Sequence, residues 1–226
     1  MSLNTPSAAA RVWLRGSELG SGGPLPGLDP SDPDEVAILL PWTDRAQADT
    51  ASALMLRRAG AGCRVLCLED DGRSGPMALM NQIFSRVNAN WVVYAAQDAF
   101  AGRLWLQHAL QGVSANPKAR LLAFNDGKWF GQLAAFGMVQ REWVLGLYGG
   151  CLFYPGYRHH YGDVELTLLA RQQQALAYHP HALLVEVDPL KDGRPVNEAD
   201  RARFLNRAAE GFDGRVVDPN LLRQFG

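Results

Sequence analysis

Short apolar runs alternate with segments of helical spacing in the first half of this chain. The runs 36–41, 64–68 and 89–96 are rich in β-branched and aliphatic residues and too short for helices, so they predict buried strands. Apolar residues three and four apart predict helices over 45–58, 76–87 and 103–113. A strand–helix–strand order with short links predicts a doubly wound, mostly parallel α/β sheet with helices on both faces.

The second half is less regular. Its patterns predict strands over 119–124, 131–140 and 182–187, and helices over 141–147, 164–174 and 198–209. Residues 1–34 are rich in Gly, Pro, Ser and Asp, which predicts a flexible N-terminal segment with at most a short strand at 11–14. We therefore expect one domain over 35–190. Residues 191–226 should form a C-terminal tail whose short helix packs on that domain.

The composition is that of a soluble globular protein. Of the 226 residues, 47% are hydrophobic and 20% are charged, and the net charge is −1, so no global field draws the chain to nucleic acid. The three cysteines have no zinc-site spacing and indicate a reducing compartment. With no signal peptide and no run of about 18 apolar residues, the sequence predicts a cytoplasmic protein.

Acidic and amide side chains follow the predicted strands repeatedly. They are Asp70 and Asp71, Asp98, Asn125 and Asp126, and Asp188, and a further acid, Asp163, precedes a helix. In an open parallel sheet, ligands bind beyond the carboxyl ends of the strands, so these acids predict a site. Helix capping is the alternative interpretation for Asp98 and Asp163, because Asp is among the preferred N-cap residues. The chain has neither a Gly-x-Gly-x-x-Gly nor a P-loop motif.

Several of these motifs together resemble one family. Pro41 follows the first strand, Asp70-Asp71-Gly72 with Ser74 follows the second, Asn81 lies in the next helix, and Asp98 follows the third strand. Later, Gly162-Asp163-Val164-Glu165-Leu166 is similar to a Glu-Asp-x-x-Leu acceptor motif. In this order, over about residues 35–190, the chain resembles the GT-A glycosyltransferases of family 2.

The resemblance implies a role for each matching residue. Pro41, Thr43, Asp70, Asp71 and Asn81 would bind the donor nucleotide, and Asp98 would hold a Mg²⁺ or Mn²⁺ ion on its diphosphate. Asp163 would be the general base that deprotonates an acceptor hydroxyl for an inverting attack. The expected acceptor pocket consists of Trp129, Tyr157, His160 and Glu165.

The chain departs from the family pattern at the metal site. Family members usually carry Asp-x-Asp or Asp-Asp, where this chain has Ala96-Gln97-Asp98. A second ligand would come from downstream, and among His179, His181 and Asp188 we expect Asp188, at a strand end.

The predicted activity is transfer of a sugar from a nucleotide-diphosphate donor to a hydroxyl of a glycan or lipid-linked acceptor, in polysaccharide biosynthesis. No nucleic-acid partner and no membrane span are expected, although peripheral membrane contact stays open. Two alternatives remain: a degenerate GT-A domain that serves as a binding or scaffold module, and a nucleotidyltransferase.

Overall fold

The computed structural model describes residues 10–20, 34–187 and 195–225. Its strands are β1 (Arg11–Arg15), β2 (Asp34–Trp42), β3 (Arg64–Glu69), β4 (Ala89–Tyr94), β5 (Ala99–Ala101), β6 (Leu121–Asn125), β7 (Gly137–Gln140) and β8 (Leu176–Glu186). Its helices are α1 (Gly16–Leu19), α2 (Arg45–Arg58), α3 (Pro76–Phe84), α4 (Trp105–Ser114), α5 (Arg141–Tyr148), α6 (Gly162–Gln172), α7 (Glu198–Ala209), α8 (Gly211–Gly214) and α9 (Pro219–Arg223).

The described strands join into an eight-stranded sheet in the order β1-β3-β2-β4-β7-β6-β8-β5. Strands β1, β3, β2 and β4 are mutually parallel, β7 runs antiparallel to β4 and β6, and β8 is parallel to β6. The expected mostly parallel α/β sheet is thus confirmed. The chain passes from β2 to β3 on one side and places β4 on the other, so the order of strands reverses beside β2.

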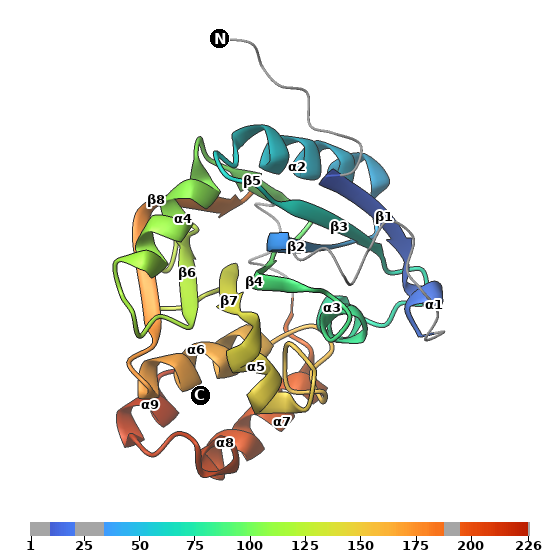
Figure 1. The fold of residues 1–226 in the computed structure, drawn as a ribbon. Helices are drawn as coiled ribbons and strands as arrows, with labels where there is room; N and C mark the ends of the chain where they lie inside the picture. The colour runs from blue at the N-terminus through green and yellow to red at the C-terminus, as the bar shows by residue number, and fades with distance from the viewer. Residues whose placement is uncertain (1–9, 21–33, 188–194, 226) are drawn as a thin grey trace.

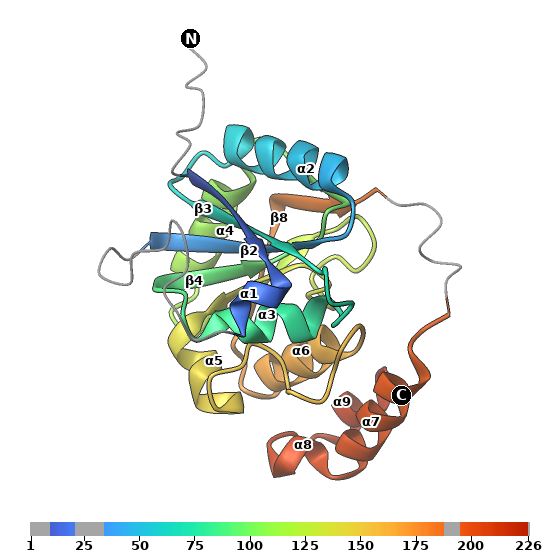
Figure 2. The same cartoon turned by 90° about the vertical axis from the view of Figure 1, so that its right-hand side faces the viewer.

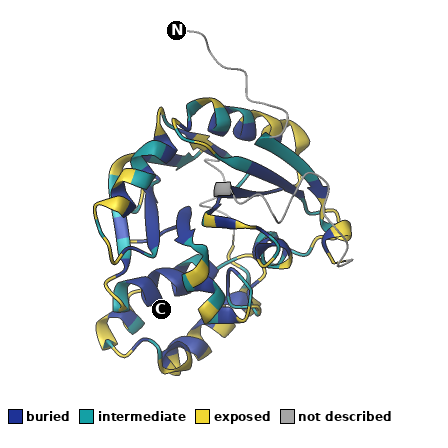
Figure 3. Cartoon of the chain, in the orientation of Figure 1, coloured by how far each residue is buried: buried dark blue, intermediate teal, exposed yellow. Residues whose placement is uncertain are grey.

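Alternate residues of β2 enter two different cores. Val36, Ile38 and Leu40 pack with residues of α2 and α4, whereas Ala37 and Leu39 pack with residues of α3 and α6. This period-2 division is the consequence of a strand that is buried on both faces. Figure 1 shows α2 and α4 outside one face of the sheet and α3, α5 and α6 against the other, and Figure 3 shows the buried strands between them.

The N-terminal segment contributes to the sheet. The expected short strand is present as β1, which pairs in parallel with β3 from Arg11 to Arg15 and is followed directly by α1. The domain therefore begins before residue 35. Residues 10–20 form this edge strand and helix. They are therefore not part of the flexible segment that the composition of 1–34 predicted.

The C-terminal segment has more structure than the one short helix expected. Figure 2 shows α7, α8 and α9 beyond α6, on the side away from the sheet. Phe204 of α7, Phe212 of α8 and Leu221 of α9 are buried in the same core as α6. Tyr161, just before α6, stacks on Phe204 with ring centroids 4.8 Å apart. This segment is an integral part of the domain.

Candidate active site

The sheet opens at its carboxyl edge between β2 and β4. The Leu39 carbonyl accepts a hydrogen bond from the Ala95 N–H, and the pairing of the two strands ends there. Two residues on, Pro41 presents its nitrogen to the same side but has no N–H to donate. Strands β2 and β4 therefore separate at the point where strand order reverses. This switch point is the usual place for a ligand crevice.

A cleft of about 1,070 Å³ lies at this edge. One wall comes from the end of β4 and the start of α3, and includes Tyr94, Ala96 and Met77. The opposite wall comes from the loop after β6, the segment before α6 and the first turn of α6. Its polar residues are Asp126, Lys128, Trp129, His159, His160 and Asp163, with Glu186 at the end of β8.

Asp163 lies in this cleft in the first turn of α6. The N-cap of the helix is Tyr161, whose backbone is left-handed at φ 72°, so Asp163 is not the N-cap residue. Tyr94 stands across from it: burial, and then the negative charge of Asp163, raise the pKa of the Tyr94 hydroxyl well above its usual range. That hydroxyl donates to the Ala134 carbonyl at 2.7 Å. The carboxylate therefore lies near Tyr94 of β4, and both residues line the cleft.

Gly162 permits this placement of α6. A methyl group at Gly162 would come within 2.8 Å of the Met77 sulfur and 3.0 Å of the Phe153 Cβ. Phe153 cannot easily move away, because its backbone N–H and carbonyl are both bonded to the Asn81 amide, at 2.8 and 3.0 Å. Asn81, expected to bind the nucleotide, thus has both ends of its side-chain amide bonded to the backbone of a cleft residue.

The Asp70 carboxylate organises the loop before α3. Its two oxygens accept from the backbone N–H groups of Ser74 at 2.6 Å and Gly75 at 3.0 Å. Its own N–H donates to the Trp42 carbonyl at 2.9 Å, which ties this loop to the end of β2. Asp70 and Pro41 therefore lie close together where β2 and β3 end.

Asp71 points elsewhere. Its oxygens accept from the N–H and hydroxyl of Ser17 at 2.9 and 2.6 Å, and the hydroxyl hydrogen bond holds the pKa of this exposed carboxyl below its ordinary value. It anchors α1 at the sheet edge. Thr43 is exposed after β2, and its N–H donates to the Gln97 side-chain oxygen at 2.7 Å.

The acceptor-side predictions divide into two groups. Trp129 and His160 line the cleft as expected, and Trp129 is held by its N–H bond to Asp126 at 2.8 Å. The assignment of Tyr157 and Glu165 to an acceptor pocket is wrong, because both side chains are fully buried. Glu165 accepts from the hydroxyls of Tyr148 and Tyr157, both at 2.9 Å, and from Arg207 of α7.

Of the two expected metal ligands, Asp98 and Asp188, the structure describes Asp98. Asp98 follows the cleft residue Ala96 and begins a turn into β5, where its carbonyl accepts from the Val187 N–H at 3.1 Å. It is not the N-cap of α4, which is Leu104. Asp188 lies outside the described residues. Within the described part of the chain, no three His, Cys, Asp or Glu side chains are grouped so as to hold a metal ion.

No protein-family profile and no curated protein match this sequence. Solved structures do match the fold. A mannosyltransferase from Pyrobaculum calidifontis, solved with GDP-mannose and Mn²⁺, aligns with TM-score 0.53 and 16% identity over 80% of this chain. The Drosophila galactosyltransferase 7, solved with manganese, UDP-galactose and xylobiose, aligns with TM-score 0.55 and 13% identity over 74% of this chain and 79% of its own. The chain has the GT-A fold.

A third GT-A structure is N-acetylgalactosaminyltransferase GalNAc-T7, which aligns with TM-score 0.61 and 9% identity over 80% of this chain and 50% of that protein. This chain spans 62% of the length of the mannosyltransferase. The likeness confirms the expected fold, and the residues must carry the argument about activity.

The structure shows contacts around the cleft that the sequence patterns did not predict. Gln97 lies where family members carry an acid, and its side-chain oxygen accepts from the N–H groups of both Thr43 and Asp44, at 2.7 and 2.9 Å. It therefore braces the loop after β2 against the loop after β4. From α7, Asp200 bonds to the backbone of the cleft residues His159 and His160, and Arg207 bonds to the buried Glu165 of α6. The sequence did not single out Asp200 or Arg207, because both lie in a helix rich in charged residues, EADRARFLNRAA.

Proposed function

We propose that this protein is an inverting glycosyltransferase, with Asp163 as the general base. The observation that carries the proposal is that this carboxylate lines the cleft from the first turn of α6, close to Tyr94 at the end of β4. Glycosyltransferases that take nucleotide sugars share this fold.

The acceptor would lie in the cleft, and the nucleotide would lie next to it. A nucleotide would lie over the ends of β2 and β3, beside Pro41 and the loop that Asp70 closes, with Thr43 at its rim. The acceptor would lie between Trp129 and His160, because an aromatic face stacks well on a sugar ring and an imidazole can bond to a hydroxyl. The acceptor class remains the predicted one, a glycan or lipid-linked hydroxyl.

The reaction follows from this arrangement. Asp163 accepts the proton of the acceptor hydroxyl while that oxygen attacks the anomeric carbon from the side opposite the diphosphate. The new carbon–oxygen bond forms as the bond to the diphosphate oxygen breaks, and the diphosphate leaves with the electron pair. Attack from the opposite side inverts the configuration of the anomeric carbon.

The site would offer a divalent cation only one or two protein carboxylates. Mg²⁺ and Mn²⁺ sites on nucleotides commonly use one or two carboxylates, with substrate phosphates and water completing the coordination. Asp98 would be that carboxylate, with Asp188 as the predicted second. The cation would neutralise charge on the leaving diphosphate.

A binding module is the second candidate. Gln97 supports it, because its side-chain oxygen is already bonded to two backbone N–H groups and brings no charge for a cation.

The structure contains no helix, among the described residues, that is long and apolar enough to cross a membrane. A cytoplasmic location and a role in polysaccharide biosynthesis stay predictions.

The first test is binding and turnover of nucleotide sugars. UDP, GDP and dTDP are screened by thermal shift with and without MnCl₂, where a ligand at 100 times its Kd adds about 2.7 kcal/mol of stability. Asp163→Asn should keep the nucleotide shift and lose donor turnover, while Glu198→Gln, an exposed first-turn acid of α7, should keep both. Turnover unchanged in Asp163→Asn would contradict the proposed base. Nucleotide binding without any turnover would favour the binding module.

A further inference from the structure

The segment Arg158–His160 forms part of the cleft wall, yet its backbone is held by a residue far along the chain. The N–H groups of Arg158, His159 and His160 all point to the carboxylate of Asp200, at 3.1, 2.8 and 3.0 Å. Asp200 is 1% exposed and lies in the first turn of α7. Three convergent N–H donors on one buried carboxylate fix the wall against α7.

The start of α7 is a rearranged capping box. The Asn197 side chain accepts from the Asp200 N–H at 3.0 Å, as an N-cap residue normally does. In an ordinary capping box the acid three residues on would bond back to the N-cap N–H. Here the Asn197 N–H donates instead to Nδ1 of His160 at 3.2 Å, which leaves the Asp200 carboxylate for the wall.

This bond also sets the tautomer of a cleft residue. Because Nδ1 of His160 accepts, the neutral ring carries its proton on Nε2. The ring therefore presents an N–H, and not a lone pair, at Nε2. His160 lines the cleft together with Asp163, so the start of α7 orients the ring of a cleft residue.

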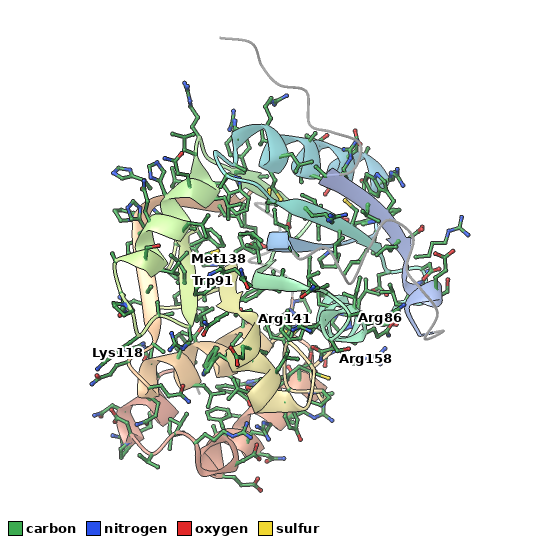
Figure 4. The ribbon with its side chains drawn as sticks, in the orientation of Figure 1. Arg86, Trp91, Lys118, Met138, Arg141 and Arg158 are labelled. Atoms are coloured by element: carbon green, nitrogen blue, oxygen red, sulfur yellow. The ribbon has the colours of Figure 1, made fainter. Side chains whose placement is uncertain are left out.

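On its other side the wall is bonded to the loop before α3 and to the first turn of that helix, on the side where the nucleotide would lie. The Arg158 guanidinium donates to the carbonyls of Ser74 and Arg73 at 3.1 and 3.2 Å, and the Arg158 carbonyl accepts from the Met77 N–H at 3.1 Å. Figure 4 shows Arg158 beside the start of α3. Gly75 is required here, since a Cβ would lie 2.4 Å from the Arg158 carbonyl oxygen. Asp70 holds Ser74 and Gly75 independently, so the donor side does not depend on α7.

We infer that Asp200 and Asn197 are positioning residues for the acceptor side of the cleft. They hold His159 and His160 in place and orient the His160 ring, and neither residue lines the cleft itself. The inference rests on the proposed function, because it assigns the 158–160 wall to the acceptor. Loss of the Asp200 charge should therefore weaken acceptor use much more than nucleotide binding.

The test compares Asp200→Asn with Asp218→Asn. Asp218 is an aspartate at the N-cap of α9, which bonds to the Asn220 N–H and does not contact the wall. Transfer to 4-nitrophenyl glycosides, from sugar conjugates of the nucleoside diphosphate found in the screen, is measured against donor hydrolysis. We expect Asp200→Asn to raise the KM for the glycoside at least tenfold, with Kd for the nucleoside diphosphate within threefold of wild type. Asp218→Asn should change neither.

Backbone hydrogen exchange provides a second measurement that needs no acceptor. Peptides covering 158–160 should exchange at least tenfold faster in Asp200→Asn, while peptides covering β3 should be unchanged. If Asp200→Asn does not fold, Asn197→Ala weakens the same contact between residues 158–160 and the start of α7. It should shift the glycoside KM in the same direction by a smaller factor. Unchanged exchange or an unchanged glycoside KM in a variant that binds nucleotide would overturn the inference. Absence of nucleotide binding in the wild type would instead overturn the proposed function.

Discussion

Replacing Arg207 by methionine should be among the most destabilising single changes in this chain. The guanidinium Nε and NH2 groups donate to the two Glu165 oxygens at 2.9 and 2.7 Å, and the two side chains are 7% and 0% exposed. The substitution would leave the Glu165 carboxylate buried without its cation. Removing one partner of a buried pair typically costs about 3–5 kcal/mol, a large share of the roughly 5–15 kcal/mol that stabilises a domain.

The expected cost lies toward the lower end of that range. Tyr148 and Tyr157 still donate to Glu165, and burial followed by the charge of Glu165 raises the pKa of both hydroxyls, so they remain protonated donors. We therefore expect a loss of about 3 kcal/mol in the free energy of unfolding. The loss also includes the stacking of the guanidinium on Tyr154, 3.5 Å from the ring centroid.

Urea unfolding at pH 7 measures this difference, and the chain offers a matched control. Asp213 bonds to the same guanidinium at 3.1 Å but is 49% exposed, so Asp213→Asn should cost less than about 1 kcal/mol. Asn suits the left-handed backbone of Asp213, at φ 61°. Combining Arg207→Met with Glu165→Gln should recover much of the loss, because no buried charge is then left unpaired. A loss below 1 kcal/mol for Arg207→Met alone would refute the reasoning.

Two further predictions concern packing and protonation. Gly162→Ala should destabilise the fold by about 1–3 kcal/mol, since its methyl would collide with Phe153. Gly146→Ala, in α5 with open space around it, should instead stabilise the fold by up to about 1 kcal/mol. Thermal unfolding of both variants checks this. Partial burial and the neighbouring charges of His108 and His181 lower the pKa of His179 below 6.5, so the unfolded chain binds more protons and stability should fall as pH drops through 6.5. His108→Gln should reduce that fall between pH 7.5 and 5.5 in urea unfolding, and an identical fall would contradict the assignment.

Local signals in the sequence were sufficient for the central helices and strands. Helix α2 spans 45–58 as predicted, because Asp44 caps it by accepting from the N–H groups of Ala46 and Gln47. The apolar runs of β2, β3 and β4 identified the parallel core directly. Asn125-Asp126-Gly127 is a turn as expected, with Asp126 accepting from the N–H groups of Lys128 and Trp129.

Elements set by tertiary contacts were harder to predict. The three-residue β5 has no periodicity to detect and exists because it pairs with β8. The predicted strand over 131–140 is reduced to β7 at 137–140, since Gly131 adopts φ 83° against Tyr178. Strand β8 begins at Leu176, before the predicted 182, and contains Pro180.

The site shows the same division. Pro41, Asp70 and Asp163 could be proposed from the sequence because each lies next to a regular element that could be read locally. Glu165 was misplaced because its partner, Arg207, lies 42 residues away and its burial depends on that partner. A charged residue in an amphipathic helix normally indicates solvent, so no local pattern distinguishes a buried Arg207 from an exposed arginine.

Gln97 shows why the departure from the family acid pair leaves the fold of the site intact. The position has a structural task, since an oxygen there must accept the N–H groups of Thr43 and Asp44 to hold the β2 and β4 loops together. An amide oxygen performs that task as a carboxylate oxygen would. What the amide does not supply is a second negative charge beside Asp98. Two adjacent carboxylates repel each other, and a bound cation offsets that repulsion. A single carboxylate is not subject to it. The crevice can therefore keep its shape with or without a cation, and under the proposed function the metal dependence of turnover would be separable from nucleotide binding.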